Sequence, residues 1–174
     1  MLPAGQVWFG AMGYVIRRIA ARVVCFNPQG QLLMIRSSDP VDRTKPDWWE
    51  LPGGGIDHGE SATDAILREL REECGVNNVV MGQLIWTQHA QFTFAGWDFD
   101  QHETLFVAQS DGDSSGVTTL EALEAVAFQE LRWRTIEELM ADPLPTVPPR
   151  LREFIVPISR GDYPNEPIDI SPRT

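Results

Sequence analysis

The chain has 174 residues, a hydrophobic fraction of 43% and a formal net charge of −11 at pH 7. This length supports one domain with a proper buried core and argues against two full-sized domains. The acidic balance disfavours nonspecific binding to nucleic acid or acidic membranes, because no basic field attracts phosphates at long range. A phosphate-bearing substrate would therefore have to be held by a metal ion and a few local cations.

Cysteine usage and the N-terminal residues both favour a cytoplasmic protein. The two cysteines, Cys25 and Cys74, are too few for a disulfide framework, and we expect both to be reduced packing residues. Arg17 and Arg18 follow the first apolar stretch, which reverses the charge order of a secretory signal peptide. No apolar run approaches the length of about 18 residues that a membrane span needs.

The first part of the chain predicts a β-hairpin. Val7–Phe9 is consistent with either an added edge strand or a contact in a homodimer. Ile19–Phe26 is β-branched and short, as in a buried strand, and Gln31–Arg36 returns as the second arm after the turn residues 27–30. The polar loop 37–47 contains two prolines, and loops of this kind at sheet ends often carry substrate contacts.

A glycine run followed by a helix forms the centre of the sequence. Gly53–Gly55 follows Trp48–Pro52, and glycine there allows positive φ and a close approach of the backbone to a ligand. Ser61 is a good N-cap, and Gly75 is a typical helix stop. These signals predict a helix from Ala62 to Cys74.

The remaining elements alternate between strands and helices. Gln83–Phe94 alternates apolar and polar residues, which predicts a long strand, and the turn Ala95–Gly96 leads into a returning strand. From Ser159 onward we expect an extended tail. The other predicted elements are a strand at His102–Gln109, a last strand at Gln129–Trp133, a short helix at Ile136–Met140 capped by Thr135, and an amphipathic helix at Pro149–Ile158.

Three glutamates converge on one side of the predicted central helix. Glu69, Glu72 and Glu73 stand at i, i+3 and i+4 and fall within an arc of about 100°, beside its apolar face. Such a group of anions is costly unless a cation neutralises it, and Mg²⁺ or Mn²⁺ takes carboxylate oxygens well. The alternative is a solvated acidic face with Arg68 and Arg71 as local partners.

The residues around these glutamates have a specific spacing. Gly54 is followed by five residues, Glu60, seven residues, and then the run from Arg68 to Val76. This segment resembles the Nudix box, G-x5-E-x7-R-E-U-x-E-E-x-G-U with U aliphatic, and every defined position matches. The resemblance implies an α/β fold, an α/β/α sandwich with a mixed central sheet. It implies a single Nudix hydrolase domain over residues 1–174, with a core of about 18–158, an N-terminal extension and a proline-containing C-terminal tail.

The resemblance also implies roles for the box residues. Arg68 and Glu60 are expected to form a structural pair that ties the loop to the helix, although Glu60 can also join the metal. The expected metal is Mg²⁺, with Mn²⁺ as a substitute. The implied metal ligands are Gly54, Glu69, Glu72 and Glu73. The resemblance implies that the three glutamates are also catalytic.

Residues outside the box are needed for the general base and for substrate contacts. In the family the base often lies far along the chain, and here Glu124 and Glu121 are the candidates, with an exposed acidic loop as the alternative. The predicted substrate contacts are Arg36, Trp49, Gly54, Gly55 and His89. Three of them have an ordinary alternative interpretation: Arg36 as a surface arginine, Trp49 as a core residue and His89 as a half-exposed histidine.

These observations predict an enzyme, a hydrolase acting on acid anhydrides in phosphorus-containing compounds. We expect Mg²⁺-dependent cleavage of a small nucleoside diphosphate derivative (nucleotide, nucleotide sugar or (d)NTP) by water attack at phosphorus. Gln91 and Phe92 occupy the place of the proline that marks many ADP-ribose enzymes, and neither tyrosine, Tyr14 or Tyr163, fits the diadenosine polyphosphate motif. Capped RNA is disfavoured by the charge. The alternative is a non-hydrolytic nucleotide-binding or regulatory Nudix domain.

Overall fold

A computed structural model describes residues 14–117 and 119–173, so the predicted strand or dimer contact at Val7–Phe9 lies outside it. The strands are β1 (Val15–Phe26), β2 (Leu32–Ser37), β3 (Trp48–Glu50), β4 (Gly53–Gly55), β5 (Val79–Phe94), β6 (Trp97–Ser110), β7 (Phe128–Arg134), β8 (Thr146–Val147) and β9 (Ile168–Asp169). The helices are α2 (Ala62–Cys74), α3 (Ala122–Ala127), α4 (Ile136–Ala141) and α5 (Leu151–Ser159).

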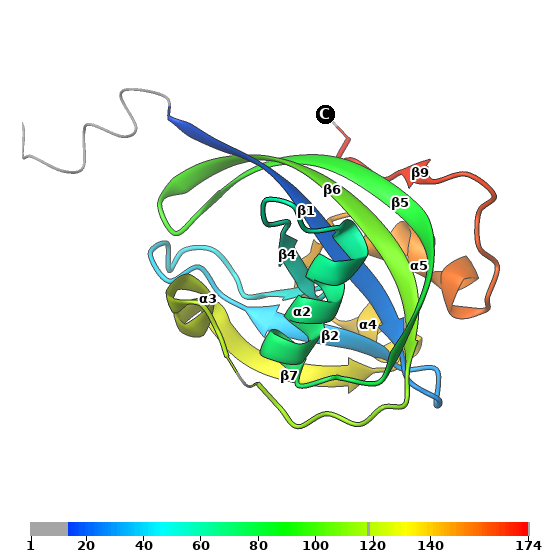
Figure 1. The fold of residues 1–174 in the computed structure, drawn as a ribbon. Coiled ribbons are helices and arrows are strands. Elements are labelled where there is room, and N and C mark those ends of the chain that lie inside the picture. Colours follow the sequence, from blue (N-terminus) through cyan, green and yellow to red (C-terminus); the bar gives the residue numbers. More distant parts are fainter. Residues whose placement is uncertain (1–13, 118, 174) are drawn as a thin grey trace, which may run out of the picture.

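The strands form one strongly curled mixed sheet (Figure 1). Its order is β8-β3-β2-β1-β6-β5-β9, with β4 paired to β1 and β7 paired to β2. The centre of the sheet is β1, which runs parallel to β6 from the Val15–Asp98 pair to the Phe26–Gln109 pair. The antiparallel hairpin of β5 and β6 extends the sheet on that side, and its inner face forms one wall of the cavity described below.

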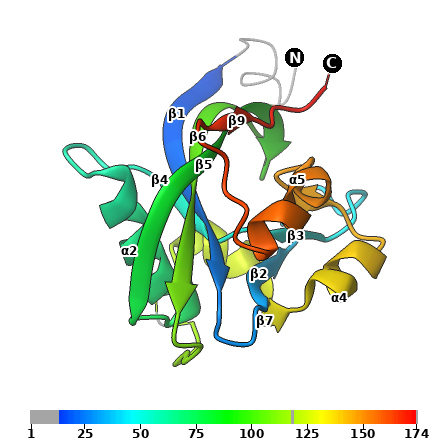
Figure 2. The same cartoon turned by 90° about the vertical axis from the view of Figure 1, so that its right-hand side faces the viewer.

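Helices cover both faces of the sheet, as Figure 2 shows with α2 on one side and α4 and α5 on the other. The α2 layer packs Ile66 and Leu70 on the sheet, and both side chains are fully buried. The opposite layer packs Leu139, Leu151 and Ile155 against a second core. Two apolar cores separated by one sheet confirm the predicted α/β/α sandwich.

Helix α2 has the predicted bounds because its caps are strong. The Ser61 side chain accepts a hydrogen bond from the Asp64 backbone N–H, as an N-cap should. Gly75 adopts the left-handed conformation at φ 62° and ends the helix by donating its N–H to the carbonyl of Arg71. The helices predicted near Thr135 and after Pro149 are also confirmed, as α4 and α5.

Several elements differ from the sequence predictions because pairing with distant strands determines them. β1 begins at Val15 and not at Ile19, since its first residues pair with β6. No strand was predicted at β3, β4 or β9, and each of these segments is a short strand held by a neighbour. The simple alternation predicted for β5 is wrong near Ile85, where a register irregularity buries both Ile85 and Trp86.

Cys25 and Cys74 are free and buried, as predicted for packing residues. Within residues 14–117 and 119–173, no helix combines the length and apolar character needed to cross a membrane.

Candidate active site

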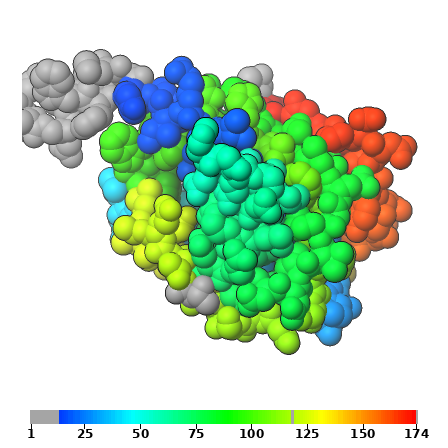
Figure 3. Space-filling model, in the orientation of Figure 1, coloured from blue at the N-terminus to red at the C-terminus, as the bar shows by residue number. Residues whose placement is uncertain are grey.

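A cavity of about 670 Å³ lies between α2, β4, α3 and the inner face of the curled sheet. Helix α2 lies across the middle of one face of the molecule, with α3 beside it in yellow (Figure 3). The part of the cavity where Glu69 and Glu73 of α2 meet Glu124 of α3 is its acidic end. Side chains of β3 and of the β5–β6 hairpin also line the cavity.

Three carboxylates meet at the acidic end. Glu69 and Glu73, one turn apart on α2, and Glu124 on α3 each offer an oxygen atom, and these atoms all lie within 4.8 Å of one another. Glu69 and Glu73 are only 5% and 8% exposed. Residues more than 50 positions apart in the sequence thus form one compact group of oxygen donors, of the kind that Mg²⁺ and Mn²⁺ prefer.

The electrostatics of this group favour a bound cation. Burial raises the pKa of Glu73 well above its ordinary value, and the charges of neighbouring glutamates raise it further. Burial likewise raises the pKa of Glu69 and of Glu124. Among the described residues, neither Glu73 nor Glu124 forms an ion pair. A divalent cation would supply the missing positive charge.

The glycine backbone of β4 packs directly on these carboxylates. A Cβ atom added to Gly54 would lie 2.7 Å from Oε1 of Glu69, so only glycine leaves room for this carboxylate. The backbone N–H of Gly53 points at Oε2 of Glu73 at 3.4 Å. Gly53 itself has φ +133°, and a Cβ there would meet the carbonyl oxygen of Ala21 at 2.2 Å. The glycine run therefore serves both the strand pairing and the acidic group.

Arg68 ties the loop before α2 to the helix. Its Nε donates to Oε1 of Glu60 at 2.9 Å, and its Nη2 donates to the Gly55 carbonyl at 3.1 Å. Its Nη1 donates to Oε1 of Glu69 at 2.8 Å. The hydrogen bonds to Glu60 raise the pKa of Arg68, and the same contact lowers the pKa of Glu60. Arg68 therefore fixes both the glycine strand and one of the three converging carboxylates.

A buried ion pair forms the inner wall of the cavity. Arg22 donates from Nε to Glu103 at 3.0 Å and from Nη1 to the Leu51 carbonyl at 2.8 Å, and it also lies 3.3 Å from Glu50. Burial alone would raise the pKa of Glu103, but Arg22 and two glutamines outweigh it and the pKa is lowered. Arg22 neutralises the buried Glu103, and Glu50 adds a second carboxylate beside the same guanidinium.

Aromatic rings and an arginine also belong to the surroundings of the cavity. Trp48 and Phe94 form an edge-to-face pair at 6.0 Å, and Phe92 stacks on Phe99 at 5.1 Å. The guanidinium of Arg18 lies 4.8 Å from the centre of the Phe99 ring and lines the cavity. Arg18 was not among the predicted site residues. The available signal was the period of two that places it on the same strand face as Arg22.

The cavity lining contains most of the residues that were predicted to bind the metal or to act as the base, but not Glu72. Gly54, Glu69, Glu73 and Glu124 line the cavity. The side chain of Glu72 is 41% exposed and lies 3.6 Å from Arg68, outside the group of three carboxylates. Glu124 belongs to α3, where a loop was expected, and its Oε2 accepts the backbone N–H of Glu121 at 3.0 Å.

Three predicted substrate contacts lie outside the cavity lining. Arg36 pairs with Asp47 at 2.7 Å and with Glu130 at 3.7 Å. Trp49 is buried, with its Nε1 donating to Asp142, because the strand β3 turns it toward the core. His89 lies on the outer face of β5. These positions argue against the predicted roles, whereas Gly54, Gly55 and the neighbouring Trp48 do line the cavity.

Known proteins resemble this chain in sequence and in fold. The family model for the NUDIX domain matches residues 16–156. An RNA pyrophosphohydrolase of Caulobacter vibrioides is 30% identical over 155 residues, which cover 81% of this chain and 78% of that protein. The MutT protein from Methanosarcina mazei Go1 is similar in structure, with a TM-score of 0.59, 23% identity and coverage of 85% and 96%. An ADP-ribose pyrophosphatase from Streptococcus suis has a TM-score of 0.57, 13% identity and coverage of 87% and 97%.

Proposed function

The chain belongs to the NUDIX-domain family, as a hydrolase acting on pyrophosphate bonds, and from this premise we propose that it is a Mg²⁺-dependent enzyme that cleaves a nucleoside diphosphate linked to another moiety. Water attacks at phosphorus in the proposed reaction. The observation that carries the proposal is the convergence of Glu69, Glu73 and Glu124 at one end of the cavity.

The residues present fit a hard divalent cation. The donors are carboxylate oxygens, two of them buried, with pKa values that burial and mutual repulsion raise. Gly54 leaves just enough space beside Glu69 for such a site. Glu72 stays in the proposed ligand set because the box spacing includes it, and its half-exposed carboxylate is the one nearest to solvent. Mn²⁺ is the expected substitute.

Each residue then has a defined task. Bound Mg²⁺ would neutralise charge on the diphosphate and lower the pKa of the attacking water. Glu124 accepts the proton of that water, because its carboxylate lies beside Glu69 and Glu73 in the cavity. Arg18 supplies a positive charge in the cavity for the substrate phosphates. Arg68 and Glu60 hold the glycine strand and Glu69 in place.

The aromatic part of the cavity lining suits a nucleobase. Trp48, Phe92 and Phe94 line the cavity with ring faces and edges, and stacking on such rings accepts every base. The volume of about 670 Å³ is within the range of ordinary small-molecule sites. We therefore favour a free nucleotide derivative as the substrate.

A second candidate substrate is the end of an RNA chain. The similarity to the Caulobacter protein named RNA pyrophosphohydrolase favours it, whereas the net charge of −11 disfavours strong binding of the rest of an RNA. A third possibility is a domain that binds nucleotides without cleaving them. It is disfavoured because every box carboxylate is retained.

One experiment separates these candidates. Release of phosphate, pyrophosphate or nucleotide would be measured for a panel of nucleoside diphosphate sugars, dinucleotides, (d)NTPs and a 5′-triphosphorylated RNA oligonucleotide, with Mg²⁺, Mn²⁺ or chelator. Metal-dependent turnover of one small derivative supports the proposal. Preferred turnover of the RNA would move the substrate to the second candidate. A silent panel in which nucleotides still raise the melting temperature would indicate a binding domain.

A further inference from the structure

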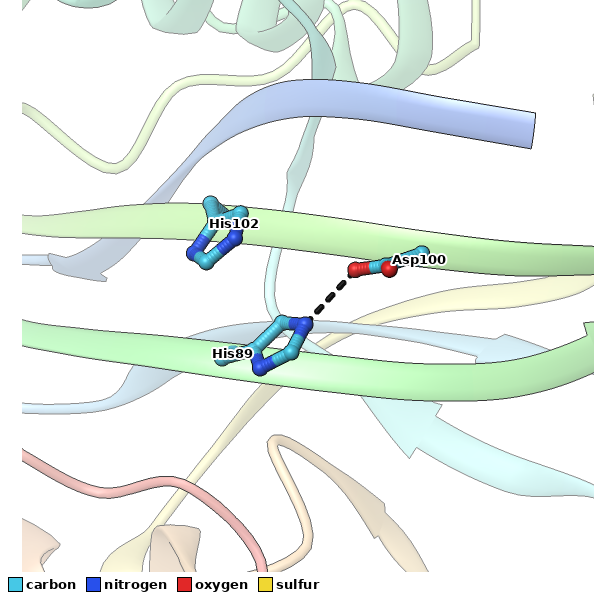
Figure 4. A group of neighbouring side chains, drawn as sticks. All are labelled: His89, Asp100 and His102. Carbon is cyan, nitrogen blue, oxygen red and sulfur yellow. Dashed lines mark hydrogen bonds and ion pairs between the residues drawn. The ribbon is translucent and has the colours of Figure 1, made fainter. Parts of the chain in front are cut away.

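A second group of potential metal ligands lies on the outer face of the β5–β6 hairpin (Figure 4). His89 on β5 stands directly opposite His102 on β6, and Asp100 lies two residues before His102. Side chains alternate along a strand, so these three point away from the cavity, whereas Gln88 and Glu103 beside them line it. Helix α2 covers other parts of this face and leaves these side chains accessible: His89 and His102 are exposed, and Asp100 is half-buried.

The three side chains are already close together. The His89 and His102 rings stack at a centroid distance of 4.3 Å and an interplanar angle of 6°, and Nε2 of His89 lies 2.6 Å from Oδ1 of Asp100. One nitrogen from each ring and one carboxylate oxygen lie within 4.8 Å of one another. Two ligands on a tetrahedral zinc ion are separated by about 3.3 Å, so modest rotations of these exposed side chains would complete a site.

We infer that the outer face of the β5–β6 hairpin binds a divalent transition-metal ion, with Zn²⁺ as the expected ion, through His89, Asp100 and His102. Two imidazoles and one carboxylate form a borderline donor set that suits Zn²⁺ and not Mg²⁺, which demands oxygen ligands. Three protein ligands leave a fourth position for water or for an external group.

The backbone beneath this group is held firmly. β5 and β6 pair across the whole hairpin, and the C-terminal strand β9 adds to β5 opposite Thr87. The backbone N–H of His89 donates to the Ser171 hydroxyl at 2.9 Å. Arg17 competes with the ion for the carboxylate of Asp100, because its Nε lies 3.8 Å from the other oxygen of that group. The Arg17 side chain is largely exposed and is free to turn toward solvent. Metal bound here would cross-link two strands whose opposite faces line the cavity.

The test is zinc binding by the full chain without an affinity tag, in excess Mg²⁺ so that the acidic site is occupied. Isothermal titration is expected to show one equivalent of Zn²⁺ with micromolar affinity. His89→Gln, His102→Gln and Asp100→Asn should each weaken binding about tenfold or more. His58→Gln is the matched control, because this third histidine lies exposed in the loop before α2, and it should leave zinc binding unchanged.

Two further readouts locate the ion. Zn²⁺ should raise the melting temperature of the wild type by a few degrees and leave that of His89→Gln unchanged. A Glu69→Gln/Glu73→Gln double variant should still bind the ion. The inference is overturned if the wild type binds no Zn²⁺ under these conditions, or if both histidine variants bind it as tightly as the wild type does.

Discussion

The backbone of Gly54 lies against the carboxylate of Glu69, close enough that a single added methyl group would come within 2.7 Å of Oε1. The contact joins the glycine strand β4 to the helix that carries the acidic residues. Arg68 strengthens the same connection from the other side, because it binds both Glu69 and the Gly55 carbonyl. The position of one proposed metal ligand therefore depends on a residue with no side chain.

Gly54→Ala should reduce activity strongly and stability only slightly. The new methyl group must push Glu69 out of the carboxylate group, since the far end of a side chain moves more easily than the backbone. We expect kcat to fall by about 100-fold, as for a small misplacement of catalytic groups. Gly30→Ala is the control for backbone strain, because Gly30 has φ +73° in a hairpin turn with open space around it. Equal activity losses in the two variants would contradict this account.

Glu73→Gln should stabilise the metal-free protein while it removes activity. The fold raises the pKa of Glu73 above its ordinary value of 4.5, so the folded state binds more protons than the unfolded state above that pH. Its contribution to stability is therefore lost as pH rises through 4.5 toward the raised value. In chelator at pH 7.5, Glu73→Gln should gain about 1 kcal/mol or more of unfolding free energy.

Glu72→Gln provides the comparison for that prediction. Its carboxylate is 41% exposed, so the substitution should leave the metal-free stability nearly unchanged while activity still falls. Denaturant unfolding of both variants across pH, with chelator present, would give the two results. If the unfolding free energies of the wild type and of Glu73→Gln depend on pH in the same way, the fold does not raise the pKa of this buried carboxylate.

Arg68→Lys should lower both stability and activity. Lysine keeps the charge but cannot bind Glu60, Glu69 and the Gly55 carbonyl at the same time, because it lacks the planar fork of the guanidinium. We expect a loss of about 1–2 kcal/mol in unfolding free energy and a lower metal affinity. Arg71→Lys is the matched control on the exposed side of the same helix. If the two variants behave alike in calorimetry and in metal titration, the anchoring role is wrong.

Glu124→Gln should reduce kcat by about 10²–10⁴-fold, as expected for loss of a general base. Burial raises the pKa of Glu124, so the wild-type rate should fall on the acid side as this carboxylate becomes protonated. That acid limb should be altered in Glu124→Gln and retained in Glu121→Gln. A full pH–rate profile for the three proteins makes the comparison, and an unchanged acid limb in Glu124→Gln would assign the base elsewhere.

Local signals in the sequence were sufficient for α2 and for the box. Ser61 and Gly75 determine the ends of the helix by contacts within a few residues, and the spacing of the glutamates places them on one helix side. These features depend on chemistry that lies within one or two helical turns. The sandwich layers, in contrast, were predicted only from the resemblance to the Nudix family.

Contacts between distant residues could not be predicted in this way. Glu124 reaches the acidic group because α3 folds beside α2, and Arg18 lines the cavity because β1 extends to pair with β6. The substrate roles predicted for Trp49 and His89 rested on residue type, and strand pairing turns the first into the core and the second to the outer surface. A strand's register decides which face a side chain occupies.

The most direct test of the central claim is a Mn²⁺ titration followed by electron paramagnetic resonance, with nucleotide release measured in the same samples. Wild-type protein should bind Mn²⁺ and turn over its preferred nucleoside diphosphate derivative in proportion to the bound metal. The Glu69→Gln/Glu73→Gln variant should stay folded and lose both binding and turnover. Metal-independent turnover in the wild type, or full binding and turnover in this variant, would contradict the account.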